Sequence, residues 1–136
     1  MITLVDDQLL SGYLRSGTWT DPIATTGCWY LRLCQAITNA QSRAGVLSSP
    51  IAALPEPQRS AALRAVLELP EPITLISLRE LAPLVAEVRG RHRLNLLNAE
   101  ALAAAIRLGA RVALSTKAPL LEAALTAEGI EFDAPA

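Results

Sequence analysis

The chain has 136 residues, of which 51% are hydrophobic and 18% charged, and its formal net charge is −1. This length and composition suit a single globular domain spanning residues 1–136. A balance so close to neutrality excludes a general attraction to nucleic acid or acidic lipid, so either would need a local patch. We find neither a signal peptide nor a run of roughly 18 uncharged apolar residues, and expect a cytoplasmic domain without membrane contact.

The expected elements alternate between short apolar strands and helices. The four strands are predicted at residues 2–5, 73–76, 112–114 and 130–132. The helices are predicted at residues 7–17, 28–41, 58–69, 78–90, 94–108 and 118–128, and residues 45–57 are expected to form a connection. This alternation predicts a parallel sheet with right-handed crossovers and a three-layer α/β/α fold.

Local signals place most helix boundaries. Asp7 is a natural N-cap for the first helix, Thr25 and Thr26 offer caps for the second, and Ser77 can cap the fourth. Gly90 is expected to end the fourth helix. Cys28 and Cys34 lie six apart on one expected helix, which rotates them by about 240°, so we predict neither a disulfide nor a metal site there.

Residues 94–132 organise the chain, and their centre is the step Ser115-Thr116-Lys117, where a strand passes into a helix. In parallel α/β proteins a reactive or binding group is usually held at such a step. The strand ending at Asp6, the helix containing Asn98-Ala99 and the Ser115-x-Lys117 step together resemble the PIN domain. Among PIN domains the chain is most similar to the VapC-type toxin ribonucleases of bacterial toxin–antitoxin pairs.

This resemblance implies a PIN-like fold with a short, mostly parallel sheet of four to five strands, in which the N-terminal strand lies between the second and third of the four strands predicted above. It also implies a homodimer, an antitoxin partner and an RNA substrate. The family holds magnesium or manganese with three or four carboxylates, because hard divalent ions take oxygen ligands and activate water against a phosphodiester.

The chain departs from that pattern at nearly every acid. Asp6 matches the first acid, whereas Trp29 and Tyr30 stand near the second, Asn98 at the third and Lys117 at the fourth. We therefore expect the metal chemistry to be lost or altered, with no cofactor and with Asp6 as the only metal ligand if there is one.

The resulting hypothesis is a degenerate site made of Asp6, Asn98 and Lys117, with Lys117 taking the cation's place beside Asp6. Asp7, Ser115 and Thr116 would support it. In this interpretation the protein acts by binding RNA or a protein partner.

Two other interpretations stay open. One is an active magnesium- or manganese-dependent endoribonuclease, neutralised by an antitoxin, that recruits Asp7, Glu80 or Glu100 as substitute ligands. Against this, Glu100 shares a helix side with Arg107, seven residues on, and is expected to face water. The other is a structural dimerisation module.

The single residues also have plain explanations. Asp6 and Asn98 are ordinary residues for a strand end and a helix start, and Lys117 could extend into solvent from a loop. Trp29 and Tyr30 suit a core or an interface better than a base-stacking surface.

Arg89, Arg91 and Arg93, with His92 among them, form the dense basic cluster of the sequence. One interpretation is a corner that contacts RNA phosphates. The other is favourable charge at a helix C-terminus and a solvated turn.

Overall fold

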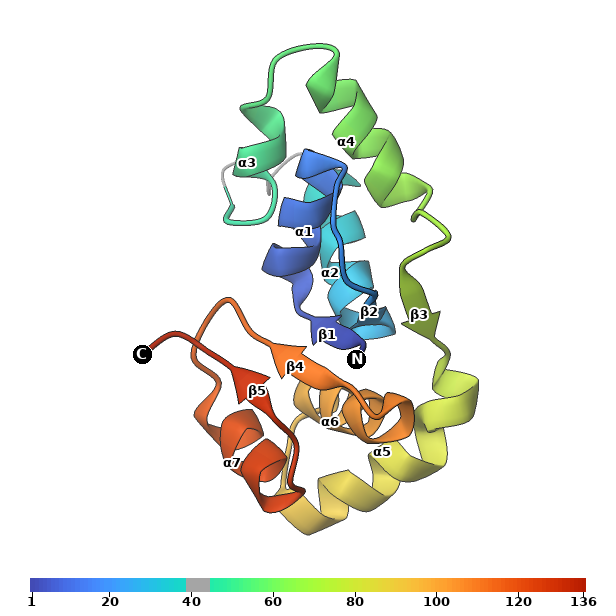
Figure 1. Ribbon diagram of the computed structural model, residues 1–136, viewed down its shortest axis with the longest axis vertical. Helices are drawn as coiled ribbons and strands as arrows, with labels where there is room; N and C mark the ends of the chain where they lie inside the picture. The colour runs from blue at the N-terminus through green and yellow to red at the C-terminus, as the bar shows by residue number, and fades with distance from the viewer. Residues whose placement is uncertain (39–44) are drawn as a thin grey trace.

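A computed structural model covers the chain, and the structure describes residues 1–38 and 45–136. Five strands form one sheet in the order β3-β2-β1-β4-β5, and every neighbouring pair is parallel (Figure 1). The strands are β1 (Thr3–Val5), β2 (Ile23–Thr26), β3 (Thr74–Ile76), β4 (Arg111–Ala113) and β5 (Phe132–Asp133). Because all strands run the same way, their carboxyl ends meet at one edge of the sheet.

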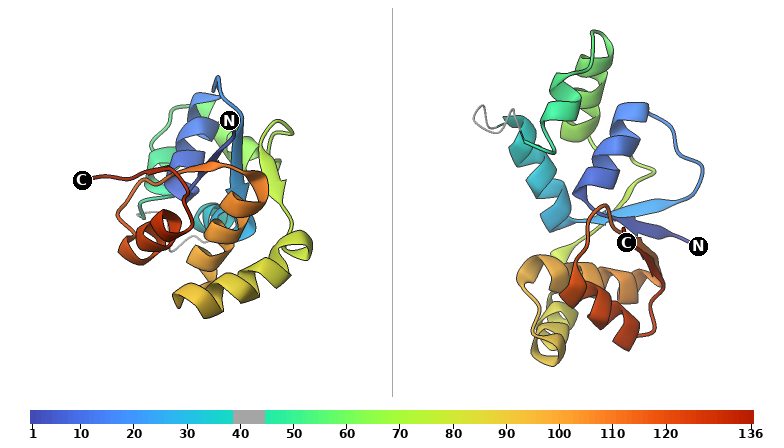
Figure 2. Two further views of the ribbon diagram at one scale, coloured as in Figure 1. Left: turned by 60° about the horizontal axis from the view of Figure 1, so that its bottom comes forward. Right: turned by 90° about the vertical axis from the view of Figure 1, so that its left-hand side faces the viewer.

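Seven helices in the described ranges cover the two faces of this sheet. They are α1 (Asp7–Ser16), α2 (Gly27–Thr38), α3 (Ser49–Ala52), α4 (Gln58–Leu67), α5 (Leu78–His92), α6 (Leu96–Leu108) and α7 (Pro119–Ala127). Helices α1 to α4 lie on one side of the sheet and α5 to α7 on the other, which is clear in both figures (Figures 1 and 2). The predicted three-layer α/β/α architecture is confirmed.

Each face of the sheet has its own core. Along β1, Leu4 packs with the buried residues of α5, α6 and α7, whereas Val5 packs with those of α1 and α4. Successive side chains of a strand point to opposite faces, so one short apolar run serves both cores. This explains why a strand of three residues, with Leu4 and Val5 buried, suffices at the centre of the sheet.

The sequence prediction missed β2. Thr25 and Thr26 were expected to cap a helix, but both are fully buried in a strand between β1 and β3. Both are β-branched, which suits a strand, and both hydroxyls are satisfied. The Thr25 hydroxyl donates to the Val5 carbonyl at 3.0 Å, and the Thr26 hydroxyl accepts from the Trp29 N–H at 3.2 Å. Hence β1 lies between β2 and β4 rather than beside residues 73–76.

Two helix boundaries also differ from the predictions. Asp6, not Asp7, is the N-cap of α1, because its side chain accepts from the Leu9 N–H. Helix α5 continues past Gly90 to His92, and Arg93 ends it in a left-handed conformation with φ 53°. Basic side chains in that last turn favour the longer helix because they offset its dipole.

Other boundaries were partly right. Ser77 caps α5 as predicted, accepting from the Arg79 N–H at 3.0 Å. The connection expected at residues 45–57 contains the short helix α3. Residues 39–41 of the second predicted helix lie outside the described residues. In the described parts of the chain, no helix is both long and apolar enough to cross a membrane.

Candidate functional site

Asp6 lies at the carboxyl edge of the sheet, directly after β1, and joins two strand ends. Its Oδ1 accepts from the Leu9 N–H at 3.0 Å, and its Oδ2 accepts from both the N–H and the hydroxyl of Ser115 at 2.7 Å. The residue is only 5% exposed. The structure thus brings Asp6 and Ser115 together across β1 and β4, as the parallel topology requires. All three bonds come from the protein, so the carboxylate is held by the fold itself.

Asp7, the next residue, is also 5% exposed but turns to a different partner. Its Oδ1 accepts from the Gln8 N–H at 2.9 Å, and its Oδ2 lies 3.3 Å from the Arg32 Nε in an ion pair on α2. Burial raises the pKa of Asp7 above its ordinary value, the Arg32 charge opposes that rise, and the Asp6 charge adds to it. Arg32 therefore offsets the charge of Asp7 only in part, and the Asp7 Oδ2 is buried without a hydrogen-bond partner.

Lys117, the single lysine of the sequence, lies in the exposed loop between β4 and α7. Among the described residues its amine forms no ion pair with Asp6 or with any other acid. Thr116 beside it is exposed as well. The expected pairing of Lys117 with Asp6 is therefore absent. Ser115 makes the contacts to Asp6, because its backbone and hydroxyl are nearer the strand end.

Glu100 is the residue that sequence reasoning placed wrongly. It was expected to face water with Arg107, but it is 0% exposed within α6, while Arg107 is exposed. Its Oε1 accepts from the Cys28 N–H at 2.8 Å, at the first turn of α2. Its Oε2 has no hydrogen-bond partner. A helix that is apolar nearly all round is buried nearly all round, and this was the signal available in the sequence.

The surroundings of Glu100 are tight. A β-carbon added at Gly27 would lie 3.4 Å from the Glu100 Oε2, so the first residue of α2 leaves little space around the carboxylate. Burial raises the pKa of the Cys28 thiol to about 11, and the Glu100 carboxylate beside it contributes to the rise. A negative charge is thus held at the N-terminus of α2, where the helix dipole favours it.

Asn98 and the aromatic pair hold structural positions. The Asn98 N–H donates to the Oδ1 of Asn95, the N-cap of α6, at 2.8 Å. Trp29 is buried in the core under α5, α6 and α7. The Tyr30 hydroxyl donates to the Val66 carbonyl at 2.6 Å, which joins α2 to α4. The expectation of a core position for Trp29 and Tyr30 is confirmed.

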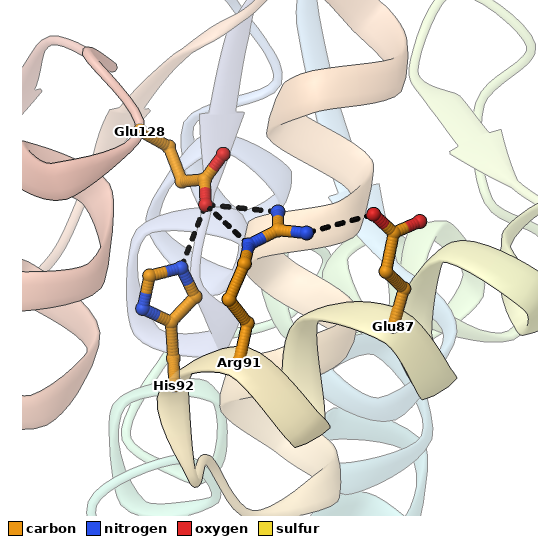
Figure 3. A network of polar contacts seen from close by, with 4 residues as sticks. All are labelled: Glu87, Arg91, His92 and Glu128. Carbon is orange, nitrogen blue, oxygen red and sulfur yellow. Dashed lines mark hydrogen bonds and ion pairs between the residues drawn. The ribbon is translucent and has the colours of Figure 1, made fainter.

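The basic cluster joins α5 to the end of α7. One oxygen of Glu128 accepts from Arg91 at 2.9 and 3.0 Å and lies 2.7 Å from the His92 Nε2, while Glu87 accepts from Arg91 at 2.7 Å (Figure 3). Hydrogen bonding, first from His92 and then from Arg91, lowers the pKa of Glu128. Two carboxylates thus counter Arg91, which agrees with the plain interpretation of the cluster.

Its other arginines serve the same turn. The Arg89 Nε donates to the Leu94 carbonyl at 3.2 Å, and the Arg93 N–H donates to the Arg89 carbonyl at 2.9 Å. An RNA contact by Arg89, Arg91 or Arg93 stays a prediction.

The described residues contain no group of three or more histidine, cysteine, aspartate or glutamate side chains placed to hold one metal ion. Glu80, named as a possible substitute ligand, is exposed in the first turn of α5. No protein-family model matches the sequence, and no curated protein shows a significant match to it. The positions and contacts of these residues therefore carry the indications of what the site does.

Proposed function

We propose that this chain is a cytoplasmic PIN-like domain of the toxin ribonuclease class whose metal-dependent nuclease activity has been lost, and that it acts by binding a protein partner. One observation carries the proposal. The carboxylate of Asp6, which would be the first metal ligand, has both oxygens occupied by protein donors, from Leu9 and from Ser115. A cation would have to compete with all three bonds.

The other charges at this edge support the same conclusion. Hard divalent ions in nuclease sites need several oxygen ligands and several negative charges. Here Asp7 is paired with Arg32. The other three acid positions of the family carry no acid: Trp29 and Tyr30 stand near the second, Asn98 at the third and Lys117 at the fourth.

A groove among the helices of one layer supports a protein partner rather than RNA. It measures about 410 Å³ and runs between α2, α3 and α4. Its lining is mostly apolar and consists of Ala36, Ile37, Ser48, Ile51, Ala52, Arg59 and Leu63. Apolar grooves between helices commonly take an apolar segment of a partner. The partner that we propose for this groove is an antitoxin segment or a second copy of the chain.

A second candidate is an active magnesium- or manganese-dependent endoribonuclease. Glu100 favours it, because this carboxylate lies at the start of α2, close to where the family carries its second acid, and one of its oxygens lacks a partner. With Asp6 and Asp7 it makes three carboxylates at one edge of the sheet, although as they stand these three are not grouped around one metal position. The third and fourth family positions would still lack acids.

Calorimetric titration with MnCl₂ separates the two candidates. We expect no saturable binding to the wild type and micromolar binding to the double variant Asn98→Asp/Lys117→Asp, which restores the two missing acids. Arg107→Asp is the matched control, because it changes the charge of an exposed residue at the other end of α6. Cleavage of a mixed RNA substrate is measured in parallel.

Micromolar manganese binding by the wild type, lost in Glu100→Gln, would instead support the active nuclease. If the double variant folds but binds no better than Arg107→Asp, Asn98 and Lys117 do not occupy the family's metal positions.

A further inference from the structure

A second hollow lies at the amino edge of the sheet, at the other end of β1 from Asp6. It measures about 320 Å³ and opens where β1 and β2 begin. It is lined by Thr3, Tyr13, Thr18, Trp19, Thr20, Asp21 and Ile23. This volume is at the lower end of the range of pockets that take small ligands, about 300–1,000 Å³. A ligand here would therefore be small.

Two aromatic rings give this hollow its chemical character. The rings of Tyr13 and Trp19 lie 6.4 Å apart between centroids, with their planes at 73°. This is an edge-to-face pair, in which the edge of one ring is directed at the face of the other, and each aromatic face carries negative electrostatic potential. A cation within about 6 Å of such faces is attracted by them, most strongly by tryptophan.

Asp21 adds a full negative charge to the same lining. No hydrogen bond or ion pair engages its carboxylate in the described residues, and the side chain is exposed. The arginines of the neighbouring elements are turned elsewhere. The Arg15 Nε donates to the Ser11 hydroxyl at 3.4 Å, and Arg111 pairs with Asp133. The hollow therefore combines aromatic faces with an acid that has no cationic partner.

We propose that this hollow binds a small organic cation with a trimethylammonium head group. The charge would be stabilised by Asp21 and by the faces of Tyr13 and Trp19, and the methyl groups would contact those rings and Ile23. The proposal is independent of any activity at the Asp6 edge.

Choline chloride is the probe, titrated into the full chain at constant ionic strength and followed by the two tryptophan indole N–H signals in nitrogen-15 NMR spectra. The Trp19 signal should shift and saturate at millimolar choline, while the signal of buried Trp29 stays in place. The neutral isostere 3,3-dimethylbutan-1-ol should bind about 5- to 30-fold more weakly, since the cation–π and ionic attractions are absent.

Asp21→Asn should weaken choline binding about 2- to 5-fold, as expected for the loss of one exposed charge interaction. The matched control is Glu131→Gln, which removes an exposed charge at the same edge of the sheet and should leave the affinity unchanged. Trp19→Phe, which keeps a ring, should also weaken binding. The proposal is overturned if Trp19 shows no saturable shift, if the neutral isostere binds as well, or if Asp21→Asn behaves like Glu131→Gln.

Discussion

Replacing Asp6 with alanine should destabilise the fold by about 3–5 kcal/mol. Loss of the N-cap bond to the Leu9 N–H contributes about 1 kcal/mol. The Ser115 N–H and hydroxyl would both lose their charged acceptor, and a hydrogen bond to a charged group is worth roughly 1.5–3 kcal/mol. The three losses are coupled through one side chain, so the total is smaller than their largest sum.

Urea denaturation followed by circular dichroism, without divalent ions, measures this loss. Ser115→Ala removes only the hydroxyl and should cost about 1.5–3 kcal/mol. The double variant should then show a coupling energy within the 0.5–3 kcal/mol range of contacting residues. Asp133→Ala, at the exposed end of β5, is the matched control and should cost less than about 1 kcal/mol.

The prediction distinguishes a structural acid from a metal ligand. In a cluster of acids that awaits a metal, removing one charge relieves repulsion, so the metal-free protein keeps or gains stability. If Asp6→Ala unfolds within about 0.5 kcal/mol of the wild type, the three bonds do not stabilise the fold and the reasoning fails.

Three further predictions concern buried or paired acids. The first concerns Cys28, measured in a Cys34→Ser background so that it is the single thiol. Because the pKa of Cys28 is about 11, it should react with iodoacetamide at pH 8 about 100-fold more slowly than a thiol of pKa 9.0. Glu100→Gln should speed this reaction, because it removes a carboxylate that raises the pKa of Cys28. Glu100→Ala should lower the free energy of unfolding, measured in urea, by about 2–4 kcal/mol, because it removes the acceptor of the Cys28 N–H and leaves a cavity. Glu100→Gln keeps that acceptor and should lower it by less than about 1.5 kcal/mol. Glu128 has a lowered pKa in the folded state, so its contribution to stability is complete above its unfolded pKa and is lost as the pH falls through the folded pKa. In Glu128→Gln the melting temperature should therefore fall less steeply with decreasing pH in that acidic range than in the wild type.

Most of the sheet could be predicted because its strands are short apolar runs with clear ends. Residues 2–5 stop at two acids, and residues 73–76 are bounded by Pro72 and Ser77. β2 could not be predicted in this way, since its Thr25 and Thr26 are polar. Only the neighbouring strand and helix supply the partners that make their burial possible.

The candidate site was predictable where topology alone decides it. Asp6 and Ser115 end adjacent parallel strands, so their meeting follows from the strand order. The burial of Glu100 depends on the Cys28 N–H, which lies 72 residues away in the sequence, and no local pattern contains that contact. The seven-residue spacing correctly places Glu100 and Arg107 on one face of α6. It does not show that other elements cover this face at Glu100 and leave it exposed at Arg107.

Asp6 and Glu100 have the same electrostatic role in this fold. Each is buried at the carboxyl edge of the sheet, and each accepts a bond from the first turn of a helix, α1 for Asp6 and α2 for Glu100. The positive end of a helix dipole can stabilise a carboxylate without any metal ion. A divalent cation entering here would have to replace those backbone donors. The burial of Asp6 and Glu100 is thus explained by the stability of α1 and α2, without a metal ion.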